Sequence, residues 1–167
     1  VERGDRPAGV TFADPDQHAA ELRVLNGVLH ELLPAPTFVF LWRVDSLRRA
    51  VSLYRADATR RYRSLDGDGD DEVPAFDYDA IHRNVVAHRA LARAWDAFFA
   101  VNDLPVIRVT YEELVRDYES TVRRLLADLG HPGANAAVPP PRLRRQADAG
   151  SEALCRSYLD HERMAAR

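Results

Sequence analysis

Two residues of types that bind anions, Arg43 and Ser52, follow the apolar run TFVFLW at residues 37–42. A continuous apolar run of this kind is typical of a strand that is covered on both faces, as in a parallel sheet. Asp45 can cap a helix that extends to about Ser64. Ligands of open α/β sheets bind at the carboxyl ends of the strands, where the next helix points its amino terminus. A guanidinium, free helix N–H groups and a hydroxyl could together hold a phosphate at this place.

The same two residues also allow a purely structural interpretation. Arg43 would then pair with a structural carboxylate, and Ser52 would be a small residue that helps the helix to pack. The local sequence fits the two interpretations equally well.

A second strand end lies in the stretch VIRVTYEEL at residues 106–114. Tyr111 is expected at the rim of the sheet, where its ring can pack on a nucleotide base while its hydroxyl forms a hydrogen bond. Glu112 and Glu113 fall in the first turn of the next helix, where negative charge is favourable. This helix-start role accounts for both glutamates, and adjacent helical residues point in different directions, so they are a poor acid–base pair.

Helical and strand-like segments alternate along the chain. Apolar spacing, caps and breakers predict strands at 7–12, 37–42 and 104–114, and helices at 15–33, 45–64, 78–102, 115–130 and within 143–167. Such alternation predicts an α/β fold with a mostly parallel sheet flanked by helices, in a single domain over residues 1–167. The first strand of an ordinary nucleotide-binding domain is not apparent.

The composition and charge of the chain argue against several classes of function. The net charge is −3 and no long basic run occurs, which argues against nucleic acid as the main partner. All 23 basic residues are arginine, so a Walker-type phosphate lysine or a Schiff-base lysine is excluded from these residues. With Cys155 as the single cysteine, no internal disulfide can form, and a buried helical position is expected for it. The chain also lacks a membrane-length apolar run and a signal core, so we expect a cytoplasmic protein.

The sequence favours no metal site. The acidic loop resembles a calcium loop at Asp66, Asp68, Asp70 and Asp77, but its sixth position is Asp71 where the sharp turn needs glycine. His82 and His88 are six residues apart and do not form a helical metal pair. One of them could be a general base if it faced the pocket, but most such histidines are surface or core residues.

Four stretches occur in an order that resembles a known family. They are FLWRVDSLRRAVSLYRADATRRYRS, FDYDAIHRNVVAHRALARAWDAFFA, LPVIRVTYEELVRDYESTVRRLLADLG and PRLRRQADAGSEALCRSYL. The set resembles the bacterial sulfotransferase family typified by trehalose sulfotransferase, in which an Arg-x-Asp segment, a "YD…I" helix, a "Y-E-[ED]-L" strand end and a late "RQAD" follow one another. The resemblance covers residues 37–158, and more weakly 9–36.

The resemblance implies a P-loop-like, three-layer fold and transfer of a sulfuryl group from 3'-phosphoadenosine-5'-phosphosulfate (PAPS) to a hydroxyl. Arg43 and Ser52 match the pair that holds the 3'-phosphate of the cofactor, and Tyr111 matches the tyrosine near the adenine. Arg145 and Gln146 match the late segment that closes over the nucleotide. The implied acceptor is a carbohydrate, lipid or small natural product, and the family allows a homodimer.

One part of the family pattern has no match in these 167 residues. The 5'-phosphosulfate loop, a strand followed by Pro-Arg-[ST]-Gly-Ser-Thr, is not found, and no catalytic base can be assigned. We therefore expect that the sequence is incomplete at its N-terminal side, and that these residues alone bind cofactor poorly and do not catalyse. Two alternatives stay open: a non-catalytic or degenerate homologue that acts as a nucleotide-binding or interaction module, and a P-loop-like nucleotide kinase, which the absence of lysine disfavours.

Overall fold

The computed structural model of the protein describes residues 15–33, 35–60, 73–135, 137–141 and 149–167. The elements in chain order are α1 (Pro15–Leu32), β1 (Phe38–Trp42), α2 (Ser46–Thr59), α3 (Tyr78–Val101), β2 (Val106–Thr110), α4 (Tyr111–Arg116), α5 (Tyr118–Asp128), the 3-10 helix η1 (Pro132–Asn135) and α6 (Ala149–Ala165). The strand expected at 7–12 and most of the acidic loop lie outside the described residues.

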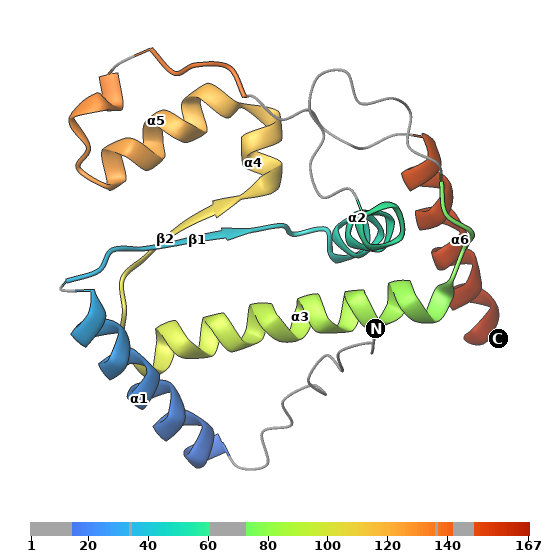
Figure 1. Ribbon diagram of the computed structural model, residues 1–167, viewed down its shortest axis with the longest axis horizontal. Helices are drawn as coiled ribbons and strands as arrows, with labels where there is room; N and C mark the ends of the chain where they lie inside the picture. Colours follow the sequence, from blue (N-terminus) through green and yellow to red (C-terminus); the bar gives the residue numbers. More distant parts are fainter. Residues whose placement is uncertain (1–14, 34, 61–72, 136, 142–148) are drawn as a thin grey trace.

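The two strands among the described residues form a parallel sheet. Phe38 pairs with Val106 at one end and Trp42 pairs with Thr110 at the other. Helices α2 and α3 form the crossover that a parallel pair requires. In Figure 1, α3 runs along one side of the strands, while α4 and α5 lie on the opposite side. The predicted alternation and the parallel pairing are confirmed, and the wider P-loop-like, three-layer fold stays a prediction.

Strand β1 is not covered on both faces by the described residues, so that expectation was wrong. Phe38 and Phe40 point toward α3 and contact Phe99 edge-to-face, at ring-centroid distances of 5.8 and 5.7 Å. Val39 and Leu41, on the other face, remain 41% and 57% exposed. A continuous apolar sequence cannot reveal which neighbouring segments reach each face of a strand.

Two helix boundaries also differ from expectation. Helix α2 ends at Thr59 and not near Ser64, because Arg60 adopts a left-handed conformation with φ 59° at the cap. The strand expected at 104–114 ends at Thr110, and the helical residues after it form α4 and α5. These two helices meet at Asp117, whose extended backbone ends one helix while its side chain caps the next. Gly130, with φ 65°, then ends α5 as predicted, in a position that favours glycine.

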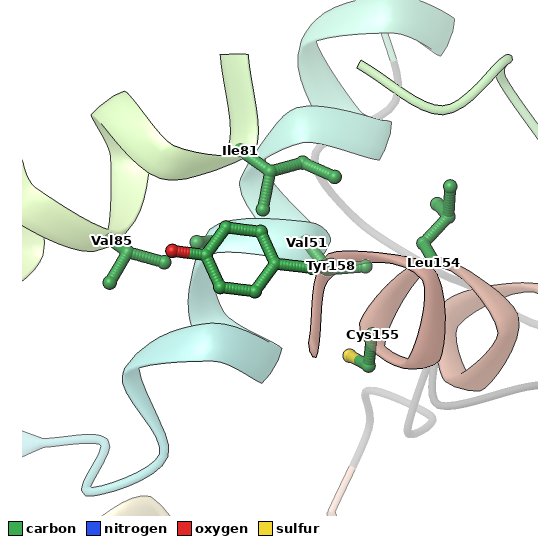
Figure 2. Packing of buried hydrophobic residues seen from close by; sticks show 7 residues of the cluster. Val51, Ile81, Val85, Leu154, Cys155 and Tyr158 are labelled. Carbon is green, nitrogen blue, oxygen red and sulfur yellow. The ribbon is translucent and has the colours of Figure 1, made fainter. Parts of the chain in front are cut away.

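Two clusters of buried side chains flank the long helix α3. One joins α1, β1, α3 and β2 around Phe98 and Phe99. The other joins α2, α3 and α6, and Figure 2 shows Tyr158 of α6 reaching toward Ile81 and Val85 of α3. Cys155 is buried in this second cluster, as predicted, and burial raises the pKa of its thiol. Helix α3 therefore fixes the sheet and the α2–α6 pair relative to each other.

Candidate functional site

The ends of the two strands bring Arg43 and Tyr111 together. Because Trp42 pairs with Thr110, the next residue of each strand emerges at the same edge of the sheet. The guanidinium carbon of Arg43 lies 4.5 Å from the centroid of the Tyr111 ring, within the range of a cation–π contact. The two residues that the sequence placed at separate strand ends thus form one unit.

Arg43 has hydrogen-bonding capacity that the described residues do not use. Its Nε atom is buried and has no hydrogen-bond partner in that part of the chain. Buried polar atoms are normally paired, and an unpaired one costs free energy. An oxyanion placed beside Arg43 could accept from this N–H, so the site fits a phosphate or sulfate group.

The carboxylate of Glu112 binds the backbone of the turn between β1 and α2. Its carboxylate oxygens accept hydrogen bonds from the N–H groups of Val44, at 3.1 Å, and Asp45, at 3.2 Å. Burial alone would raise the pKa of Glu112, but these two N–H groups and the charge of Arg43 hold it below its ordinary value. The carboxylate of Glu112 is therefore held in its ionised form at this turn by backbone N–H groups.

The amino terminus of α2 does not offer all of the free N–H groups that the sequence suggested. Asp45 caps the helix by accepting from the N–H of Arg48 at 2.9 Å. Burial would raise the pKa of Asp45, but its hydrogen bonds from Arg48 lower it. With the N–H groups of Val44, Asp45 and Arg48 occupied by carboxylates, an added anion has Arg43 and not these backbone groups as its partner. Within the first turn of α2 itself, the cap occupies the N–H group of Arg48, so the helix terminus is only partly available to an added anion.

Ser52 lies on the face of α2 that meets the start of α6. Residues 48, 52 and 55 fall on one helical stripe because they are spaced by four and three. The guanidinium of Arg48 binds the carboxylate of Glu152 in two places, at 3.0 and 2.8 Å. The guanidinium of Arg55, only 7% exposed, donates to the Ser151 hydroxyl at 2.6 Å. Half-buried Ser52 lies between these two bridges on the stripe.

The predicted residues Arg145 and Gln146 lie outside the described residues. The described chain resumes at Ala149, the first residue of α6. Since Ser151 and Glu152 contact α2, this end of the segment is tied to the helix that carries Ser52. The contact of Arg145 with the nucleotide therefore stays a prediction.

His88 is a buried polar residue that the sequence did not assign to the site. Its ring stacks on Trp42 at 3.8 Å, and its Nδ1 lies 3.2 Å from the hydroxyl of Ser46. Its Nε2 is buried without a hydrogen-bond partner in the described part of the chain. A usable signal was present: Ile81, Val85 and His88 follow helical spacing, and all three are buried.

Two negative findings concern the described residues alone. They contain no group of three or more histidine, cysteine, aspartate or glutamate side chains that could hold a metal ion. None of the helices in the part of the chain that the structure describes is long and apolar enough to cross a membrane.

Comparison with known proteins gives a consistent match. The family described as Stf0 sulphotransferase matches residues 13–161. A trehalose 2-sulfotransferase of Mycolicibacterium smegmatis is 31% identical over 144 residues, which are 86% of this chain and 52% of that protein. A trehalose 2-sulfotransferase of Mycobacterium tuberculosis is 30% identical over 117 residues, 70% of this chain and 43% of that protein. The chain spans about half the length of these curated relatives, and the matched region includes β1, α2, β2 and α4.

Proposed function

Because the chain belongs to the Stf0 sulphotransferase family, we propose that it carries the 3'-phosphate-binding part of an enzyme that transfers a sulfuryl group from PAPS to a hydroxyl. The observation that supports this most directly is the Arg43–Tyr111 unit at the carboxyl ends of the strands, with the unpaired buried Nε of Arg43. A guanidinium beside an aromatic ring suits a ligand that joins a phosphate to a planar base.

The contacts proposed for Arg43, Ser52 and Tyr111 involve residues that the structure describes. Arg43 would bind the 3'-phosphate through its Nε–H and charge, and Ser52 would add a hydroxyl from α2. Tyr111 would lie against the adenine with the ring face that Arg43 does not cover. Arg145 and Gln146 are proposed to add contacts from the segment before α6. When bound, PAPS would supply the activated sulfuryl group, while the residue that takes the proton from the acceptor stays unassigned.

A carbohydrate hydroxyl is the acceptor that we propose first. Both curated relatives described above are named trehalose 2-sulfotransferases, which makes a hydroxyl group of a sugar the chemical precedent. A lipid or natural-product hydroxyl, a homodimeric assembly and a cytoplasmic location remain proposals from the sequence.

A non-catalytic nucleotide-binding module is the second candidate. Such a module would keep the same 3'-phosphate contacts and would lack the backbone N–H donors that stabilise charge on the reacting sulfuryl group.

Binding of adenosine 3',5'-bisphosphate, followed by calorimetry and thermal unfolding, tests the shared part of both candidates. We expect Arg43→Ala to weaken binding about tenfold or more, because a charged hydrogen bond to phosphate is lost. Arg93→Ala, on an exposed position of α3, is the matched control and should bind as the wild type does. Equal affinity of the Arg43→Ala variant and the wild type would show that Arg43 is structural.

Transfer activity separates the two candidates. Incubation with PAPS and trehalose, followed by mass spectrometry of the sugar, measures sulfation directly. Product formation by the protein as its gene encodes it supports the enzyme, whereas nucleotide binding by that protein without sulfation of trehalose or other hydroxyl acceptors supports the binding module.

A further inference from the structure

We propose that Glu112 is a positioning residue that fixes the backbone after β1 and thereby directs the Arg43 guanidinium toward its anion. The proposal rests on the proposed nucleotide site, but it concerns a residue that contacts the backbone of the chain and not the ligand. The residues joined by Glu112 are far apart in sequence: 68 positions separate it from Val44 and 67 from Asp45.

The geometry shows how a carboxylate could control Arg43 without touching its guanidinium. The N–H of Val44 lies in the same rigid peptide plane as the carbonyl carbon of Arg43. A hydrogen bond to that N–H therefore restrains ψ of Arg43, and the bond to Asp45 restrains the next peptide plane. Asp45 then caps α2 through Arg48, so the chain from Arg43 to the first turn of α2 is held at successive points.

The neighbouring glutamate has a different and local role. Glu113 accepts from the N–H of Thr110 at 2.7 Å, and the Thr110 hydroxyl accepts from the N–H of Glu113 at 3.1 Å. This reciprocal pair is a capping box that starts α4. Tyr111, Glu112 and Glu113 thus divide three tasks: the ring stacks on Arg43, one carboxylate holds the β1–α2 turn, and the other begins the helix. From the sequence, we expected the same helix-start role for both glutamates.

The placement of Glu112 joins the two strand ends. Tyr111 and Glu112 are consecutive, so the residue that stacks on Arg43 is adjacent to the one that holds the backbone after Arg43. A shift of α4 would move both contacts together. The guanidinium is consequently held from two directions, by the ring and by the turn, before any ligand binds.

A spectroscopic experiment tests this arrangement without a ligand. The ring of Tyr111 should shift the Nε–H proton resonance of Arg43. The Arg43→Lys variant assigns this resonance, because the signal disappears from its spectrum. The Tyr111→Leu variant shows the chemical shift of the resonance in the absence of the ring. Glu112→Gln keeps one acceptor oxygen but removes the second acceptor and the charge. We expect this variant to move the Arg43 resonance toward its position in Tyr111→Leu. Glu119→Gln, the same chemical change in an exposed ion pair on α5, should leave the resonance in place.

Nucleotide affinity supplies the second measurement. If Glu112 acts through Arg43, Glu112→Gln should weaken binding of adenosine 3',5'-bisphosphate about tenfold, and should weaken it no further when Arg43 is already alanine. Independent, additive losses in the double variant would overturn the positioning role, as would an unmoved Arg43 resonance.

The two measurements also distinguish this proposal from the proposed function. A wild-type protein that does not bind the nucleotide would contradict the nucleotide site, while the resonance of Arg43 would still decide whether Glu112 positions it. If the Glu112→Gln variant keeps the wild-type chemical shift of Arg43 Nε–H but has a lower melting temperature, Glu112 only stabilises the fold.

Discussion

The buried imidazole of His88 lies among charges that oppose its protonation. Burial and the charges of Arg49, Arg43 and Arg89 lower its pKa below the ordinary value of 6.5, against a smaller opposite effect of Glu112. In the unfolded chain the imidazole takes up a proton more readily than in the folded one. The stability that His88 contributes is therefore fully present above pH 6.5 and is lost as the pH falls below that value.

We accordingly expect the free energy of unfolding of the wild type to fall more steeply than that of His88→Gln between about pH 6.5 and pH 5, where free histidine titrates. Urea denaturation at successive pH values measures both curves. His30→Gln, an exposed position on α1, is the control and should follow the wild type. Parallel curves for the wild type and His88→Gln would contradict the depressed pKa.

Individual residues differ in how well the sequence could predict them. Arg43 and Tyr111 were assigned correctly to strand ends, because an arginine or tyrosine after an apolar run is a local signal. The hydrogen bonds of Glu112 were not predictable, since their partners lie 67 and 68 positions away in the sequence. His88 was missed because a polar residue on an apolar stripe could equally have pointed to solvent.

At the scale of elements, α3 carries the packing that relates the sheet to α2 and α6. Ile81 is fully buried where these three helices meet. We expect Ile81→Ala to lower the free energy of unfolding by about 3 kcal/mol, the usual cost of a large-to-small change in a core. Val86→Ala, on the same helix but 49% exposed, should cost less than about 0.5 kcal/mol. Similar losses in chemical denaturation would show that α6 does not pack on α3 in solution.

Element types were easier to predict than the faces they bury. Helix α3 was expected at 78–102 and is found at Tyr78–Val101, with a side-chain cap from Asp77. Leu91 is one of the apolar residues of this helix, yet it is 50% exposed in the structure described. Helical spacing identifies an apolar stripe, but its burial depends on which other elements lie alongside. The same reason explains the exposed face of β1.

At the scale of the whole molecule, the ordered motifs predicted the Stf0 sulphotransferase family correctly. Several motifs in a fixed order identify a family even when each single residue allows more than one interpretation. The nucleotide site that this family suggests draws on residues from separate parts of the chain. Arg43 follows β1, Tyr111 follows β2, and Ser52 lies on α2 between the two arginines that bind the first turn of α6. The contacts of α2 with Ser151 and Glu152 connect this last part to the other two.

Ligand binding should therefore protect distant segments together. At about 100 times its Kd, a ligand stabilises the folded state by about 2.7 kcal/mol, which slows hydrogen exchange wherever opening requires its release. With adenosine 3',5'-bisphosphate, we expect slower exchange at 43–46, 110–113 and 149–153, and little change in α1, whose contacts are with α3. Protection should disappear in Arg43→Ala and persist in Arg93→Ala. Protection restricted to 43–46 would mean that the ligand binds the β1–α2 turn alone, without the strand-end and α6 contacts that the site requires.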